Sequence, residues 1–224
     1  MTINIHLYQP DSIAQSTTCL LDHQEQARAN TFAFDKDKAL YIAAHTFLRQ
    51  TLSQYAPLSS EQWKFQQNTY GKPSIANIGY ERLHFSLSYT QGFVACAISE
   101  ETTVGFDVEK VTSLPDLDTL CHYALSTKEA KDVLGITDLE QRKQRFFTYW
   151  TLKEAYIKAR GMGLSLPLQQ FTLEQNKHLN WQLQSDETSP LMQHEMWRFE
   201  HKEINHYHLS LCVPKSDHTI CWLS

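Results

Sequence analysis

The sequence predicts an α+β protein made of two similar halves that pack closely together. Both halves present the same order of elements, in which a strand is followed by helices and then by several antiparallel strands. No linker-like or low-complexity stretch separates the halves, and we place the boundary so that residues 1–102 form one half and residues 103–224 the other. The chain has 224 residues, of which 42% are hydrophobic, and can therefore bury a sizeable core.

Strand and helix periodicities define the elements of the first half. Alternation predicts a strand at residues 3–8, and helical spacing of apolar residues predicts helices at residues 20–29 and 35–56. Asp35 is a candidate cap for the second helix, which we expect to stop before Pro57. Three strands are predicted to follow at residues 63–67, 83–89 and 93–99.

Capping signals define the helices of the second half. Ser126 with Glu129, and Thr137 with Glu140, each have the spacing of a capping box and predict two helix starts. The second of these helices is long, and Gly161 suits the left-handed position at its end. Strands are predicted at residues 102–110 before the helices and at 171–174, 181–183, 196–200 and 206–213 after them.

Composition excludes several classes of partner. The formal net charge of −5 provides no basic field for nucleic acid or for an anionic membrane surface. The N-terminus lacks a basic region followed by an apolar run, and no apolar segment approaches the roughly 20 residues that span a bilayer, so we expect a cytoplasmic protein. Five scattered cysteines without CxxC spacing are expected to be reduced structural residues.

Two acidic residues share one face of the strand in VGFDVEK. Side chains alternate along a strand, so Asp107 and Glu109 lie on the same face, with attachment points roughly 7 Å apart. Carboxylates at that separation can converge on a hard cation such as magnesium. Gly105 is expected to leave room beside them for a phosphate group. The alternative is an ordinary amphipathic strand with a solvated acidic face.

The long helix carries a carboxylate within an apolar stripe. Phe146, Trp150 and Ile157 mark the stripe, and Glu154 falls inside its span. Desolvating a carboxylate there is costly unless a cation accompanies it. Lys158 lies at i+4 and could pair with Glu154, as in many surface helices. A metal ion is the other candidate partner.

These segments resemble a known family. VGFDVEK and WTLKEAYIKARGMGLSLPL closely resemble the GxDxE and WxxKEAxxK motifs of the 4'-phosphopantetheinyl transferase superfamily, most closely its surfactin-synthetase-activating type. YGKP and the spacing of the motifs add to the match, which extends more weakly over residues 28–168. The resemblance implies two similar α+β halves with the active site in the cleft between them. It also implies holo-acyl-carrier-protein synthase activity, in which the phosphopantetheine group of coenzyme A moves to a serine of an apo acyl or peptidyl carrier protein and 3',5'-ADP departs.

The resemblance implies roles for the motif residues. Asp107, Glu109 and Glu154 would hold magnesium with the coenzyme A pyrophosphate, and Lys158 would contact phosphate and assist the leaving group. Either Glu154 or Glu109 would take the proton of the acceptor serine, and we favour Glu154. Lys153 would orient the helix or contact the carrier protein.

The nucleotide end of the site departs from the family pattern. Lys72 and Arg28 match positions that contact coenzyme A in relatives, and we expect Arg49 to support helix packing instead. Relatives carry a Ser-His pair whose histidine helps bind the 3'-phosphate, whereas this chain has Ser88 followed by Tyr89. Tyrosine carries no positive charge near neutral pH, so we expect weaker dependence on the 3'-phosphate.

Alternatives to an active transferase remain. A carrier-protein-binding module that has lost turnover is compatible with Tyr89, whereas a convergent phosphotransferase is disfavoured because no P-loop motif appears. We expect His201, His206 and His208 to lie on a solvated strand face without a matching ligand set. Because both halves lie in one chain, a monomer suffices for the site.

Overall fold

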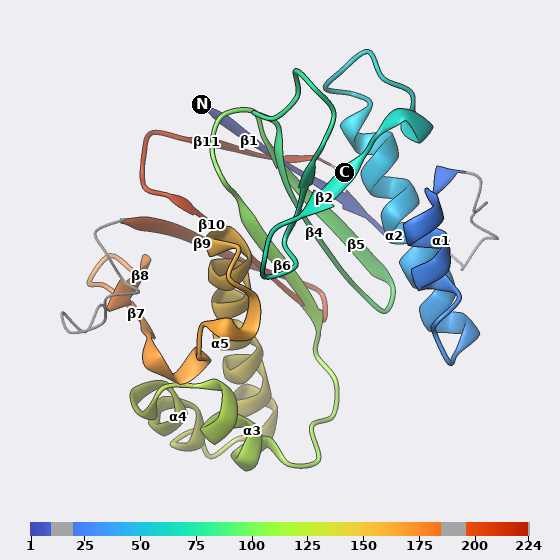
Figure 1. The fold of residues 1–224 in the computed structure, drawn as a ribbon. Helices are drawn as coiled ribbons and strands as arrows, with labels where there is room; N and C mark the ends of the chain where they lie inside the picture. The colour runs from blue at the N-terminus through green and yellow to red at the C-terminus, as the bar shows by residue number, and fades with distance from the viewer. Residues whose placement is uncertain (10–19, 185–195, 224) are drawn as a thin grey trace.

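The structure, a computed structural model, confirms a mixed α+β fold and describes residues 1–9, 20–184 and 196–223 (Figure 1). The α-helices of the described residues are α1 (His23–Ala29), α2 (Asp35–Leu52), α3 (Leu117–Ala124), α4 (Thr127–Leu134) and α5 (Leu139–Arg160). The strands are β1 (Thr2–Tyr8), β2 (Phe65–Gln67), β3 (Pro73–Ile75), β4 (His84–Thr90), β5 (Phe93–Ser99), β6 (Gly105–Lys110), β7 (Thr172–Gln175), β8 (Trp181–Gln184), β9 (Trp197–Ile204), β10 (Tyr207–Pro214) and β11 (Thr219–Leu223).

Two main sheets organise the chain. One has the order β11-β1-β5-β4 and the other the order β6-β10-β9, while β2-β3 and β7-β8 form separate two-stranded pairs. β11 runs parallel to β1, with Thr219 beside Thr2, so the last strand completes the sheet of the first residues. The division into residues 1–102 and 103–224 stays a prediction.

An apolar layer separates the two main sheets. Ile5 and Ala97 of the first sheet and Phe106 and Leu211 of the second belong to one fully buried cluster. α2 packs against β4 and β5, and α5 packs against β6 and β10 (Figure 1). Because the apolar face of β6 is used between the sheets, its carboxylate face is turned toward α5.

Most predicted elements are confirmed, with shifted ends. Ser126 forms the predicted capping box with Glu129, and Gly161 ends α5 in the left-handed conformation, with φ of 65°. The second predicted capping box is wrong, because Asp138 rather than Thr137 caps α5 through the backbone N–H of Gln141. The sequence patterns missed α3, β3 and β11.

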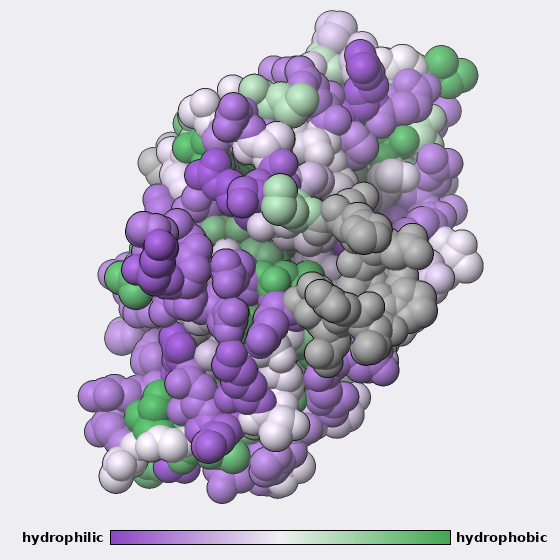
Figure 2. Space-filling model, turned by 90° about the vertical axis from the view of Figure 1, so that its left-hand side faces the viewer, coloured by the Kyte–Doolittle hydropathy of each residue, from purple (hydrophilic) through white to green (hydrophobic). Residues whose placement is uncertain are grey.

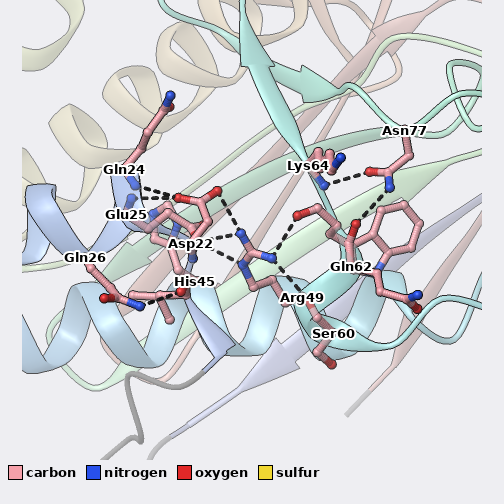
Figure 3. Close-up of polar contacts among 12 residues, drawn as sticks. Asp22, Gln24, Glu25, Gln26, His45, Arg49, Ser60, Gln62, Lys64 and Asn77 are labelled. Atoms are coloured by element: carbon pink, nitrogen blue, oxygen red, sulfur yellow. Dashed lines mark hydrogen bonds and ion pairs between the residues drawn. The ribbon is translucent and has the colours of Figure 1, made fainter.

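A buried arginine joins α1 to α2. Arg49 is fully buried and donates to Glu25 at 2.9 Å and to Asp22 at 3.0 Å, the two residues of the α1 capping box (Figure 3). It also donates to the carbonyl oxygens of Ser60 and Trp63. The prediction that Arg49 supports packing is confirmed, and the cluster positions α1 at the edge of the cavity described below.

The prediction of a solvated histidine face is wrong for two of the three residues. His206 is exposed, but His208 is 1% exposed and His201 is largely covered. α5 explains the burial, because Thr148 on that helix lies 3.4 Å from His208. Burial lowers the pKa of His208 to about 4.

Figure 2 shows one face that is mainly hydrophilic, with hydrophobic residues in small groups. Within the described ranges, no helix is long and apolar enough to cross a membrane. The cysteines at positions 96, 121, 212 and 221 are free thiols, three of them buried; Cys19 lies outside the described residues.

Candidate active site

β6 and α5 approach each other closely at the carboxylate face. A Cβ added to Gly105 would lie 2.0 Å from the carbonyl oxygen of Ala155 and 2.3 Å from the backbone nitrogen of Ala159. The space beside Gly105 is therefore filled by the backbone of α5, and our expectation that it admits a phosphate group is wrong. The close contact instead brings Glu154 and Lys158 of α5 over the acidic face of the strand.

Asp107 lies at the centre of this contact. It is 3% exposed, and its Oδ1 accepts hydrogen bonds from Ser88 Oγ at 2.8 Å and Lys158 Nζ at 2.7 Å. Its Oδ2 is buried with no hydrogen-bond partner among the described residues. A buried carboxylate oxygen without a donor is costly, so this atom is a candidate ligand for a cation.

The pKa values of the neighbouring glutamates, Glu109 and Glu154, are both raised. Burial, followed by repulsion from Asp107, raises the pKa of Glu109 to about 7. The same two causes, in the same order, raise the pKa of Glu154. Lys158 partly offsets both shifts. Three carboxyl groups face one lysine here, and an added cation would relieve their repulsion.

Two serines join the sheets behind the site. The Oγ of Ser86 accepts from the backbone N–H of Phe106 at 2.9 Å, and that of Ser88 accepts from Val108 at 3.2 Å. These two hydroxyls accept backbone N–H groups at the edge of β6 that pairs with no strand of the described part of the chain. Ser88 also donates to Asp107, so in this structure its hydroxyl positions a carboxylate of the site.

Lys72 lies in the cavity wall but has protein partners. Its Nζ donates to the hydroxyl of Thr103 at 2.9 Å, to the carbonyl of Ala159 at 3.1 Å and to that of Val104 at 3.3 Å. Burial lowers the pKa of Lys72 to about 8. The three ammonium protons are matched by three oxygen acceptors, so contact with a phosphate would require Lys72 to exchange one of them.

A cavity of about 840 Å³ lies between the first half and α5. Five predicted site residues line it: Arg28, Lys72, Tyr89, Glu154 and Lys158. Ser88, Asp107 and Glu109 are not among its lining residues. The sequence patterns missed Tyr41 and His45, which line the same cavity and stack with ring centroids 4.0 Å apart. Their i, i+4 spacing predicts that they share one face of α2. The neighbouring sequence does not indicate that this face lines a cavity.

Lys153, next to Glu154 in the motif, points away from the cavity. Its side chain is fully buried and pairs with Glu129 of α4 at 2.7 Å. The predicted contact of Lys153 with a carrier protein is wrong, because the side chain has no exposed surface. The other predicted role, orientation of the helix, agrees with the ion pair to Glu129.

Comparison with known proteins identifies the family of this chain. The family profile described as "4'-phosphopantetheinyl transferase superfamily" matches residues 103–212, and the profile of the N-terminal region of 4'-phosphopantetheinyl transferases matches residues 9–101. The 4'-phosphopantetheinyl transferase HetI of Nostoc sp. is 35% identical over 162 residues, which cover 72% of this chain and 68% of HetI. The chain belongs to the 4'-phosphopantetheinyl transferase superfamily. The predicted resemblance is confirmed.

Other members of this superfamily show weaker similarity. The L-aminoadipate-semialdehyde dehydrogenase-phosphopantetheinyl transferase of Mus musculus is 24% identical, over 87% of this chain and 67% of its own. The transferase Sfp of Bacillus subtilis is 28% identical, over 67% of this chain and 64% of the length of Sfp. A solved holo-(acyl-carrier-protein) synthase from Bacillus anthracis, in complex with CoA (3',5'-ADP), has 15% identity and a TM-score of 0.44, over 52% of this transferase and 97% of that chain.

Proposed function

We propose that this chain transfers the 4'-phosphopantetheine group of coenzyme A to a serine of an apo acyl or peptidyl carrier protein and releases 3',5'-ADP. Membership of the superfamily supports the reaction, and the carboxylate cluster of β6 and α5 at the edge of the cavity supports the place where it occurs. The observation that carries the proposal is the convergence of Asp107, Glu154 and Lys158 from two elements that lie about fifty residues apart in sequence.

Magnesium fits the residues present. Asp107 Oδ2 is buried with no donor among the described residues, and burial, followed by repulsion from Asp107, raises the pKa of both glutamates. Carboxylate oxygens are the ligands that this hard cation prefers. Asp107, Glu109 and Glu154 would hold it. When bound, it would act as a Lewis acid that stabilises charge developing on the transferred phosphate.

Other residues of the chain are candidates for binding coenzyme A and stabilising the leaving group. Lys158 holds Asp107 at 2.7 Å, is 30% exposed and lines the cavity, so it can reach a phosphate oxygen and stabilise the leaving group. Arg28 lines the cavity at the end of α1 and adds positive charge there. Lys72 and Tyr89 form other parts of the cavity wall and would face coenzyme A there, whereas Ser88 would act indirectly by positioning Asp107.

The proton of the acceptor serine needs a base, and Glu154 is our candidate. It lines the cavity, whereas Glu109 does not. Burial and repulsion raise its pKa, which brings a carboxylate closer to the range in which a general base works near neutral pH. Glu109 would then serve as a metal ligand alone.

Intact-mass analysis tests the function directly. The protein is incubated with coenzyme A, magnesium and several apo carrier proteins, and addition of one phosphopantetheine group to a carrier is expected. A serine-to-alanine carrier is the matched control, because it lacks the acceptor hydroxyl. Failure of modification with every carrier would favour the alternative, a carrier-protein-binding module without turnover. The cytoplasmic location and the monomeric state remain predictions from the sequence.

Replacing Tyr89 by histidine tests the nucleotide end. Tyr89 lines the cavity, and burial raises the pKa of its hydroxyl, so the side chain is neutral in the working range. A histidine adds a donor that can become charged, and hydrogen bonds to charged groups contribute about 1.5–3 kcal/mol, or roughly 10- to 100-fold. We expect Tyr89→His to raise by about tenfold the ratio of kcat/KM for coenzyme A to that for 3'-dephospho-coenzyme A.

Tyr89→Phe is the control for this experiment, because it keeps the ring and removes only the hydroxyl. Its ratio is expected to stay close to that of the unaltered protein. An equal ratio in Tyr89→His and the unaltered protein would contradict a role for position 89 in recognising the 3'-phosphate.

A further inference from the structure

A second cluster of possible metal ligands lies on β9 and β10, the two strands labelled in Figure 1, and none of its members lines the cavity. One ligand atom each from His201, Glu203 and His208 lie within 4.8 Å of one another. His201 Nε2 is 3.3 Å from His208 Nδ1 and 3.8 Å from Glu203 Oε1. The cluster has no part in the proposed transfer reaction, so its role is a separate question.

The hydrogen bonds around His201 determine which of its nitrogens carries the proton. Thr151 Oγ1 lies 2.9 Å from the carbonyl oxygen of Phe147, which can only accept, so the threonine donates there. Ser210 Oγ, 2.8 Å from Thr151 Oγ1, must then donate to it. The single hydroxyl proton of Ser210 is thereby used, and His201 Nδ1 at 3.0 Å has to donate to Ser210. In the neutral ring, His201 Nε2 therefore presents a lone pair to His208.

His208 presents a lone pair to the same space. Its Nε2 lies 2.6 Å from Gln144 Oε1, an acceptor, and therefore carries the proton of the neutral ring. Thr148 Oγ1 cannot supply a proton to Nδ1, because it donates to the carbonyl oxygen of Gln144 at 3.0 Å. Two unprotonated nitrogens thus face each other at 3.3 Å, beside the carboxylate of Glu203. Such an arrangement is stabilised by a cation.

We propose that His201, His208 and Glu203 form a binding site for a borderline divalent cation of the zinc type. Zinc–nitrogen bonds of about 2.0–2.1 Å in tetrahedral geometry place two ligand nitrogens about 3.3 Å apart, which matches the observed separation. Both imidazoles also have the partner that a ligating histidine uses on its other nitrogen, here Ser210 and Gln144. Glu203 is 59% exposed, so a cation can enter from solvent and keep a water as fourth ligand.

This site is distinct from the proposed magnesium site but close to it. His208 lies directly opposite Glu109 in the pairing of β10 with β6, and opposite Glu203 in the pairing of β10 with β9. The two sites therefore occupy neighbouring positions on the sheet face beneath α5. The ligand types separate them, since imidazole nitrogen suits zinc, copper, iron or nickel and carboxylate oxygen suits magnesium.

Zinc binding to the intact, metal-free protein tests the proposal by isothermal titration calorimetry. One zinc ion is expected per chain in the presence of excess magnesium. His201→Gln is expected to weaken zinc binding by about 100-fold or more. Loss of a residue that only hydrogen-bonds to a ligand already weakens metal binding by about 10- to 100-fold, and His201 is itself a proposed ligand. Glu203→Gln, at an exposed position, is expected to weaken it about tenfold. His206→Gln, which removes an exposed histidine from the same hairpin, is the matched control and should bind as the unaltered protein does.

Circular dichroism and thermal unfolding of each variant show whether the fold is retained, and Glu203→Gln keeps the test informative if His201→Gln does not fold. Asp107→Asn serves as the control for zinc in the carboxylate site. Absence of zinc binding would overturn the proposal. Zinc binding that is lost in Asp107→Asn but kept in Glu203→Gln and His201→Gln would also overturn it.

Discussion

Asp107→Asn is expected to reduce phosphopantetheine transfer by roughly 1,000-fold or more, because a metal ligand acts on charge that develops in the transition state. Asparagine keeps one oxygen to accept from Ser88 and Lys158, but it removes the negative charge and the buried oxygen that has no donor. Single-turnover transfer to an apo carrier protein, followed by intact mass, measures the loss.

The fold of Asp107→Asn is expected to persist. The substitution weakens the ion pair with Lys158, but it also relieves the repulsion from Asp107 that, after burial, contributes most to the raised pKa of Glu109 and of Glu154. Thermal unfolding should therefore change little. Asp118→Asn, at an exposed carboxylate of α3, is the control and should transfer normally. Normal transfer by Asp107→Asn itself would remove the proposed metal site.

Local patterns were sufficient to predict the elements that carry the carboxylates. Alternation in β6 put Asp107 and Glu109 on one face because strand geometry requires it, and the structure turns that face toward α5. The apolar stripe and the glycine at its end likewise predicted α5 and its C-terminus. These features depend on neighbours within a few residues, which a sequence displays directly.

Contacts between distant segments could not be predicted in this way. β11 pairs with β1 across almost the whole chain, and no local signal states a partner for a short strand. The glycine at position 105 suggested space for a ligand, because the sequence does not show that the backbone of α5 fills this space. His208 looked solvated for the same reason, since only the packing of Thr148 and its helix buries it.

Lys153 shows how such a distant contact supports the site. Its side chain is fully buried, and its Nζ contacts Glu129 Oε2, the carbonyl oxygen of Leu168 and that of Phe171, each at 2.7 Å. Glu129 in turn accepts from the backbone N–H of Leu173 at 2.7 Å. All three ammonium protons are matched, so the pair fixes the rotation of α5, and with it the direction of the adjacent Glu154.

Lys153→Met is therefore expected to destabilise the protein by about 3–5 kcal/mol, because it leaves the Glu129 carboxylate buried without its cation. For a chain of this size that corresponds to a fall in Tm of about 6–20 °C. Urea unfolding and thermal scans measure it. Lys143→Met, which breaks an i, i+3 pair with the exposed Glu140 on the same helix, is the control and should change stability by less than about 1 kcal/mol.

The double variant Lys153→Met, Glu129→Gln separates loss of the ion pair from loss of packing. Removing the second charge eliminates the unpaired buried carboxylate, while the amide oxygen of glutamine can still accept from one of the two backbone N–H groups that Glu129 binds, those of Leu173 and Ser126. The double variant should therefore be more stable than Lys153→Met alone, with a coupling energy of about 1–3 kcal/mol. Strictly additive effects would mean that Lys153 acts only by filling space, and that the charge of Glu129 does not help to hold α5 in place.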